Sequence, residues 1–276
     1  MSVFFKALEQ AEHDRHGQRP AAPVERDAPS VAVIDDRRAA PPVTPGELDE
    51  HLVSLTMPVS FAAEQYRALR HTVEQARLAV GHTAFGIGSP ESGDGKTTTA
   101  INLAGALAQA RDARVLLIEA DLRSPQVAER LGLGSAPRPG LVDAIQATDL
   151  ALDDVVVRLP AYNLSVVLAG RRPVAPYEVL KSPRLGHLLD EGRRDYDYVL
   201  LDTPPLVAFP DCRIIGSYVD GWLVVVAAHR TGRDLLGEAL DLLEPSKTMG
   251  FVFTHDERFR ANGRYYGGYY GAGDAR

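Results

Sequence analysis

Short apolar runs recur between residues 83 and 254, and each has the length of a single β-strand. The runs are apolar at nearly every position, which is typical of strands buried on both faces of a sheet. Most are separated by stretches with helical spacing or helix start signals such as Ser182-Pro183. They read TAFGIG, RVLLIEA, NLSVVLA, DYVLLD, GWLVVVAA and MGFVFT. This pattern predicts an α/β fold, a parallel sheet with helices on both faces.

A helical pattern precedes the first of these runs, in the segment FAAEQYRALRHTVEQARLA. Its apolar residues recur at the spacing of one helix face. Glu64, Arg67 and Arg70 recur every three residues and so form a charged stripe beside the apolar one. From the residues alone, this stripe is either a solvated face with one ion pair or a contact between subunits.

The N-terminal part of the chain lacks this alternation. Its first residues form a short amphipathic stripe, which either docks on a partner or membrane surface or is a weakly ordered end. Prolines, alanines and charges of both signs then predominate as far as Pro45, which predicts a disordered linker. We therefore expect a helix and a Pro/Ala-rich linker in 1–50, one folded domain in 51–254 and a tail in 255–276.

The C-terminal tail ends in NGRYYGGYYGAGDAR, where four tyrosines lie among glycines without helical or strand period. We expect this segment to be mobile and exposed. Taken alone, it could be a low-complexity end without a specific task. The tyrosines are Tyr265, Tyr266, Tyr269 and Tyr270.

Composition excludes several classes of protein. The formal net charge of -7 argues against nucleic-acid binding. Cys212 is the only cysteine of the chain, so neither an intrachain disulfide nor a cysteine-based metal site is possible, and a reducing cytosol is the natural compartment. The longest apolar run, WLVVVAA, has strand length, and we expect that this chain does not cross a membrane itself.

A candidate phosphate site follows the first apolar run, in the segment GSPESGDGKTTTAINLAGALAQA. Gly93 and Gly95 allow the backbone to curl so that its N–H groups point inward, and Lys96 adds a positive charge at the start of a helix. Thr97 would place its hydroxyl on Mg²⁺. Pro90 stands where the strict P-loop pattern has glycine, but strand, loop, Lys-Thr and helix occur in the required order.

Carboxylates end two further apolar runs. Glu119 and Asp121 follow one run, and Asp202 ends another. The carboxyl ends of parallel strands share one edge of the sheet, where ligands of such folds bind. Because Mg²⁺ prefers oxygen ligands and one or two carboxylates besides the phosphates, these side chains complete a predicted nucleotide site.

These motifs resemble those of the bacterial tyrosine kinases of capsule and exopolysaccharide systems, whose P-loop fold is related to the MinD and ParA ATPases. The resemblance covers roughly residues 60–276. It rests on SPESGDGKTTTAINLA, VLLIEADLR, YVLLDTPP, the terminal tyrosines and the helix EQYRALR, which matches a Glu-x-x-Arg-x-x-Arg pattern used for ring assembly.

The resemblance implies an ATP- and Mg²⁺-dependent tyrosine autokinase whose tail tyrosines are phosphorylated in trans within an oligomer. It implies that Lys96 holds the β/γ-phosphates, that Thr97, Asp202 and Glu119 hold Mg²⁺, and that Glu119 or Asp121 orients or deprotonates the tyrosine. Glu64, Arg67 and Arg70 would then assemble the ring. The nucleotide-binding residues would be Ser92, Gly93, Asp94, Gly95, Lys96, Thr97, Thr98 and Arg123.

The resemblance also implies partners and a location. They are a separate membrane-embedded activator of the polysaccharide co-polymerase type and a phosphotyrosine phosphatase. The kinase would be cytoplasmic and recruited to the inner face of the membrane through the activator.

Two residues depart from the family's usual pattern. Glu119 stands where Asp is usual, and the extra methylene could displace its carboxylate by about 1 Å and lower the rate. Thr254 stands where relatives often carry an Asn that can read adenine, so base selectivity is open.

Two other functions compete with the kinase. A MinD- or ParA-like positioning ATPase has a signature lysine near the start of its loop, where this chain has Glu91. A nucleotide-binding assembly module without phosphotransfer is the second, and the substitution by Glu119 is the feature that favours it.

Overall fold

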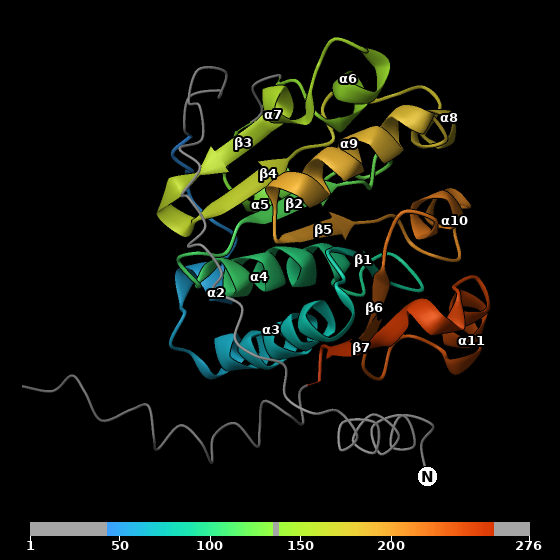
Figure 1. Ribbon diagram of the computed structural model, residues 1–276. Helices are drawn as coiled ribbons and strands as arrows, with labels where there is room; N and C mark the ends of the chain where they lie inside the picture. Colours follow the sequence, from blue (N-terminus) through green and yellow to red (C-terminus); the bar gives the residue numbers. More distant parts are fainter. Residues whose placement is uncertain (1–42, 135–137, 257–276) are drawn as a thin grey trace, which may run out of the picture. The chain divides into compact units, whose positions relative to one another are not determined.

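The computed structural model describes residues 43–134 and 138–256, which all lie in one compact unit spanning Arg37–Arg276. These residues form one seven-stranded sheet with the order β3-β4-β2-β5-β1-β6-β7 (Figure 1). Neighbouring strands are parallel except β3 and β4, which are antiparallel. The strands are β1 (Ala84–Gly88), β2 (Val115–Glu119), β3 (Val156–Leu159), β4 (Leu164–Val167), β5 (Tyr198–Asp202), β6 (Gly221–Ala227) and β7 (Thr248–Thr254).

Helices pack on both faces of the sheet, as the apolar strands predict (Figure 1). One face carries α2 (Val53–Thr56), α3 (Phe61–Val80), α4 (Lys96–Ala108) and α5 (Val127–Arg130). The other carries α6 (Leu141–Gln146), α7 (Leu152–Val155), α8 (Pro176–Leu180), α9 (Pro183–Asp195), α10 (Asp211–Gly216) and α11 (Arg233–Asp241). Short 3₁₀ turns, η2 (Pro160–Tyr162) and η3 (Pro245–Lys247), precede β4 and β7.

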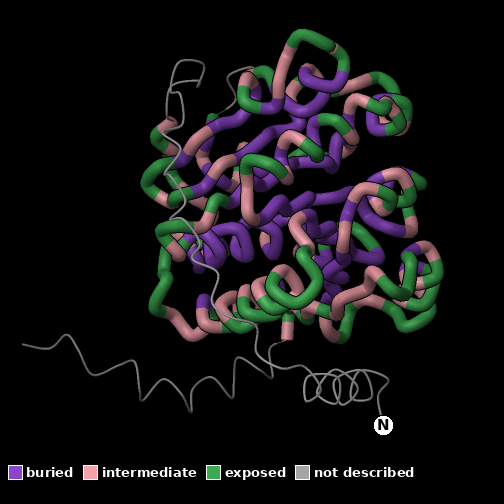
Figure 2. The backbone as a smooth tube through the Cα atoms, in the orientation of Figure 1, coloured by how far each residue is buried: buried purple, intermediate pink, exposed green. Residues whose placement is uncertain are grey.

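Each central strand supplies side chains to two apolar cores. In β2, Leu116 and Ile118 join the core beneath α6 and α9, whereas Val115 and Leu117 join the core beneath α3 and α4. Alternate residues of a strand point to opposite faces, so a run that is apolar throughout fills both cores. In Figure 2 the buried residues, coloured purple, gather in the middle of the domain, where the central strands and α4 lie. The predicted fold class is confirmed.

The edge strand β3 is the element that the sequence pattern missed. It follows α7 directly and contributes only four residues, Val156–Leu159, to an antiparallel pair with β4. An apolar run of that length cannot be distinguished by its periodicity from the end of a helix. All of the predicted strands and the helix before them are present, and α3 ends at Val80, followed by Gly81 with a φ of 78°.

The segment before α2 is part of the folded unit. Gly46 N–H donates to Gly132 O at 2.8 Å, and Asp49 N–H donates to Arg130 O at 2.9 Å. The folded part therefore includes residues from Val43 on, earlier than the predicted boundary at 51. The predicted N-terminal helix, most of the linker and the tyrosine tail lie outside the described residues. In the described part of the chain, no helix combines the length and the apolar character that crossing a bilayer requires.

Candidate active site

The phosphate loop, residues 89–95, joins β1 to α4. Gly93 and Gly95 have φ values of 90° and 94°, a left-handed conformation that residues with a Cβ rarely adopt. Helix α4 begins at Lys96, so its first backbone N–H groups have no partners within the helix and its dipole favours an anion there. The predicted order of strand, glycine loop and helix is present, in the form that binds phosphates in other proteins.

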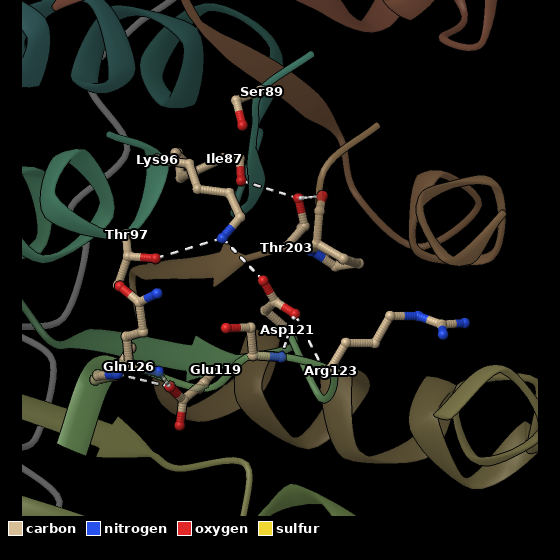
Figure 3. A network of polar contacts seen from close by, with 12 residues as sticks. Ile87, Ser89, Lys96, Thr97, Glu119, Asp121, Arg123, Gln126 and Thr203 are labelled. Carbon is tan, nitrogen blue, oxygen red and sulfur yellow. Dashed lines mark hydrogen bonds and ion pairs between the residues drawn. The ribbon is translucent and has the colours of Figure 1, made fainter. Parts of the chain in front are cut away.

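Lys96 lies at the centre of a buried polar network (Figure 3). Its Nζ is 2.8 Å from Asp121 Oδ2 and 3.5 Å from Thr97 Oγ1. Burial lowers the pKa of Lys96, but the charges of Asp202 and Asp121 raise it by more, so that it lies above the ordinary value. The lysine is therefore charged at neutral pH, and it is held at the head of α4.

Asp202 ends β5 next to β2, where its Cα pairs with that of Glu119. Its side chain is buried, and Oδ1 has no hydrogen-bond partner among the described residues. Burial raises the pKa of Asp202 to about 7, although Lys96 and the Thr97 hydroxyl act in the opposite direction. An unpaired carboxylate oxygen in the interior is costly, which is typical of a site shaped for a ligand.

The Asp202 and Thr97 oxygens fit a Mg²⁺ ion. The described residues contain no group of three or more His, Cys, Asp or Glu side chains arranged to hold a metal. Mg²⁺ bound with a nucleotide needs no such cluster, because one or two protein oxygens, the phosphates and water complete its octahedron. The unpaired Asp202 Oδ1 is the observation that favours this interpretation.

Glu119 is directed elsewhere. Its Oε1 accepts the N–H groups of Gln126 and Val127, both at 2.6 Å, and its Oε2 accepts that of Ala169 at 3.0 Å. Burial raises the pKa of Glu119 above its ordinary value, although these backbone bonds act in the opposite direction. Glu119 also lines a cleft of about 990 Å³ that is bordered by α5 and the residues after β4. The role of Glu119 as metal ligand or base stays a prediction. In the structure its carboxylate links two backbone segments, residues 126–127 and Ala169, by hydrogen bonds.

Asp121 folds the loop that follows it. Its Oδ1 accepts the N–H groups of Arg123 and Ser124, at 3.2 and 3.1 Å, while Oδ2 faces Lys96. The Arg123 guanidinium points away from Lys96 (Figure 3) and pairs with the fully buried Asp211 at 2.7 Å. It also lies 4.1 Å from the centre of the Phe209 ring. Arg123 therefore anchors this loop to α10 here, and its predicted contact with nucleotide stays a prediction.

Asp94 is a loop residue whose side chain turns inward. It is 2% exposed, and its Oδ1 accepts the hydroxyl of Thr231 at 2.9 Å. Its backbone O accepts the hydroxyl of Thr254 at 2.6 Å. The Asp94 carboxylate thus shapes the loop, and only the backbone is left to face a phosphate. Thr231, in a loop, and Asp211, at the start of α10, were missed by the sequence analysis because single residues outside a motif carry no recognisable spacing.

The charged stripe of α3 contacts its own domain. Arg70 donates to Ala106 O near the end of α4 at 2.9 Å and pairs with Glu74 at 2.7 Å. Arg67 donates to the Gln109 side chain at 3.2 Å and pairs with Glu64. Both arginines remain partly exposed. The predicted subunit contact is untested, and the stripe also fastens α3 to the last turn of α4.

The fold and the site define a P-loop nucleotide-binding protein. A glycine-lysine-threonine loop, the first turn of α4, Asp121 after β2 and Asp202 at the end of β5 meet at the carboxyl edge of the sheet. The family model described as an AAA domain matches residues 86–213.

Comparisons with known proteins specify the family. The tyrosine-protein kinase YwqD of Bacillus subtilis (strain 168) is 32% identical over 229 residues, 82% of this chain and 94% of the relative. The kinase domain of the Escherichia coli tyrosine kinase ETK matches with a TM-score of 0.68 and 27% identity, over 74% of this chain and 79% of that chain. The chain belongs to this family of bacterial tyrosine-protein kinases, as the motifs predict.

Other matches show the range of the family and of the fold. A putative tyrosine-protein kinase EpsB of Ralstonia nicotianae is 31% identical over 206 residues, which are 74% of this chain but 27% of the relative. The chimerical protein CapA2B2 matches with a TM-score of 0.69 and 24% identity, over 80% of this chain and 97% of that chain. The cell division ATPase MinD of Pyrococcus furiosus matches with a TM-score of 0.52 and 22% identity, over 64% and 73%. The likeness to CapA2B2 and to MinD, at 24% and 22% identity, shows the fold alone.

Proposed function

We propose that this protein is an ATP-dependent tyrosine autokinase that phosphorylates the tail tyrosines Tyr265, Tyr266, Tyr269 and Tyr270 in trans within an oligomer. The observation that carries this proposal is the buried Lys96, held between Asp121 and Asp202 at the head of α4. Family membership supplies the reaction, and the glycine-tyrosine tail supplies an acceptor. The family's link to capsule and exopolysaccharide systems supports a role in regulating polymer assembly and export.

The nucleotide binds by its phosphates. Backbone N–H groups of the loop from Ser92 to Gly95 and the first turn of α4 receive the phosphate oxygens. Lys96 moves from Asp121 to the β- and γ-phosphates, because the negative phosphate oxygens compete with the Asp121 carboxylate for its ammonium group. Thr97 and Asp202 would hold Mg²⁺, which would supply positive charge to neutralise the phosphates.

Movement of Lys96 frees Asp121 for the chemical step. The phenol oxygen of the acceptor forms a bond to the γ-phosphorus while the bond from that phosphorus to the β–γ bridging oxygen breaks, and ADP leaves. Asp121 Oδ2, no longer paired with Lys96, accepts the phenolic proton. We assign this role to Asp121 and not to Glu119, because the Glu119 carboxylate already accepts three backbone N–H groups.

The last strand residue before the acceptor tail, Thr254, contacts the phosphate loop. Thr254, at the end of β7, donates to Asp94 of the phosphate loop, and Tyr265 follows eleven residues later. Eleven extended residues span at most about 36 to 40 Å, so a tail has the length to reach either its own site or that of a neighbour. Transfer in trans is therefore a proposal about assembly, and it requires a test that separates the two chains.

A ring of copies would present each tail to the next site. The exposed parts of Arg67 and Arg70 are the surface proposed for this contact, beside the bonds that both make to their own domain. Phosphorylation opposes such a ring, because each phosphotyrosine adds about 1.5 to 2 negative charges to a chain already at -7. The cycle is assembly, mutual labelling and separation.

The partners follow from family membership. We propose a separate membrane-embedded activator of the polysaccharide co-polymerase type, a phosphotyrosine phosphatase, and no nucleic acid. The kinase then works at the inner face of the membrane while remaining cytoplasmic.

A mixing experiment tests the function and the direction of transfer together. One chain keeps the site and has all four tail tyrosines replaced by Phe, whereas the other carries Lys96→Met and an intact tail. With Mg²⁺-ATP, we expect phosphotyrosine on the Lys96→Met tail, mapped by mass spectrometry. Label on wild-type chains but none in the mixture would mean transfer in cis. No label in any sample, with nucleotide still bound, would favour the assembly module without phosphotransfer.

The ring has its own test. Light scattering should find Lys96→Met protein oligomeric at tens of micromolar with Mg²⁺-nucleotide, and Arg67→Glu with Arg70→Glu should make it monomeric. Because both arginines also contact the end of α4, urea unfolding must show that the charge-reversed domain is still folded. A monomeric Lys96→Met protein would remove the ring and leave the tail to chance encounters.

A further inference from the structure

Two threonines outside the nucleotide motifs hold the phosphate loop from one side. Thr231 lies in the loop between β6 and α11, and Thr254 is the last residue of β7. Strands β6 and β7 are neighbours in the sheet, and Ala227 of β6 pairs with Thr254 of β7. We call Thr231 and Thr254 the threonine clamp, because both hydroxyls end on the same loop residue, Asp94.

Thr254 acts on the backbone of the loop. Its hydroxyl donates to Asp94 O at 2.6 Å, and its Oγ1 also lies 3.0 Å from His255 Nδ1 and 3.5 Å from Val226 O. Its methyl group lies over Gly95, where an added Cβ would come within 3.3 Å of Thr254 Cγ2. The peptide between Asp94 and Gly95, directly before Lys96, is therefore fixed by a hydrogen bond and by contact.

Thr231 acts on the side chain of the same residue. Its Oγ1 accepts the N–H of Ala227 at 3.1 Å and donates to Asp94 Oδ1 at 2.9 Å. The other oxygen, Asp94 Oδ2, accepts the N–H of Glu91 at 3.2 Å. The hydroxyl thus links the end of β6 to a carboxylate that is itself folded back onto the loop.

We propose that the threonine clamp presets the phosphate loop for nucleotide, so that Thr231 and Thr254 are positioning residues for phosphate binding. The inference rests on the proposed function only in that the loop binds nucleotide. Ordering a loop on binding costs conformational entropy, so a loop that is ordered before binding does not lose affinity to that cost. Both threonines act through Asp94, to which their hydroxyls donate.

The chain supplies a matched control on the same strand. Thr248 begins β7 and also donates its hydroxyl to a backbone carbonyl, that of Glu244 at 3.4 Å, but it lies at the end of the strand away from the loop. Thr254→Val and Thr248→Val therefore remove the same chemistry from the two ends of one strand. Thr254→Ser keeps the hydroxyl and should restore its effect.

Affinity for a fluorescent ADP analogue with Mg²⁺, measured by titration, tests the inference without any phosphotransfer. A lost hydrogen bond is worth about 0.5 to 1.5 kcal/mol, so we expect Thr254→Val and Thr231→Val each to weaken binding about two- to tenfold. Thr248→Val should bind as the wild type does, and Thr254→Ser should recover the part of the affinity that the hydroxyl supplies. Urea unfolding of all variants separates a loss of loop order from a loss of fold.

The outcomes separate the two claims. Equal affinities of wild type and Thr254→Val overturn the clamp and leave the proposed kinase intact. An equal loss of affinity in Thr254→Val and Thr248→Val also overturns it, because the effect would then belong to the strand in general. If the wild-type protein does not bind the analogue at all, both the clamp and the proposed function fail.

Discussion

The carboxylates at the two edges of the sheet, half-buried at the amino edge and buried at the carboxyl edge, have different partners. At the amino edge, Asp220 precedes β6 and accepts the N–H groups of Thr83 and Ala84 at 2.9 and 2.8 Å, and it pairs with Arg193. At the carboxyl edge, Asp202 ends β5 with one oxygen that has no partner among the described residues. Both residues adjoin parallel strands. One carboxylate is fully paired and the other is not.

The pKa values follow this difference. Burial raises the pKa of Asp220, but its bonds to Ala84 and Thr83 and the charge of Arg193 bring it below the ordinary value. Asp197, also at the amino edge, has a lowered pKa, because its bonds with Arg114 outweigh burial. Burial raises the pKa of Asp202 to about 7. The lowered pKa values at the amino edge stabilise the fold, whereas the unpaired oxygen of Asp202 at the carboxyl edge costs stability, as our proposal of a ligand there requires.

Asp202→Asn should separate the two properties most strongly. We expect phosphotransfer to fall by at least about 100-fold, because a charge aimed at the metal and phosphates is lost. The free energy of unfolding at pH 7 should stay the same or rise, since a buried charge with an unpaired oxygen is removed. Initial rates and urea unfolding measure the two effects. A variant that loses activity only because it unfolds would contradict the proposed division between the edges.

Glu119→Asp tests whether Glu119 belongs to the chemistry or to the framework. The shorter side chain withdraws the carboxylate by about 1.5 Å, and at least one of its three backbone donors loses its partner. We expect a rate about tenfold lower and a loss of about 1 to 3 kcal/mol in the free energy of unfolding. Glu129→Asp, on the exposed side of α5, is the control. A faster enzyme would show instead that Glu119 is a compromised ligand or base.

Asp220→Asn should have the smallest effect on activity and a clear effect on stability. The amide nitrogen cannot accept the bonds that the carboxylate accepts, so we expect a loss of about 1 to 3 kcal/mol in the free energy of unfolding at pH 7. Phosphotransfer should change less than about twofold. Asp190→Asn is the control, because Asp190 is exposed and its oxygen is 4.0 Å from Arg193.

The effect of Asp220→Asn on the free energy of unfolding should depend on pH. A carboxyl whose folded pKa is lowered stabilises fully above the ordinary value of 3.8 and loses this contribution as pH falls through the lower folded value. The difference between wild type and Asp220→Asn should therefore shrink below about pH 4. Urea titrations at a series of pH values measure it. A difference that grows toward acid pH would contradict the sign of the shift.

The sequence predicted most of the fold because its strands are apolar throughout and the phosphate loop has a fixed order of residue types. Lys96, Thr97, Asp121 and Asp202 could be placed together because the ends of parallel strands must share an edge. The edge strand β3 was missed because four residues carry too little periodicity.

The partners of each carboxylate could not be predicted in the same way. Glu119 and Asp121 are two residues apart and point to different neighbours, one to the backbone of Val127 and Ala169 and one to Lys96. Thr231 and Thr254 reach Asp94 from 137 and 160 residues away in the sequence. Such contacts depend on the packed structure, and no local pattern of residue types specifies them.

The most direct test of the account is phosphotyrosine on the tail of the purified protein. Wild-type and Lys96→Met chains are incubated with Mg²⁺-ATP, with and without the cytoplasmic segment of a candidate activator, and each tail tyrosine is mapped by mass spectrometry. The account predicts phosphate on the cluster from Tyr265 to Tyr270 in the wild type and none in Lys96→Met, with circular dichroism showing both chains folded. Persistent phosphotyrosine in the Lys96→Met protein, or an unlabelled wild type with the activator present, would contradict it.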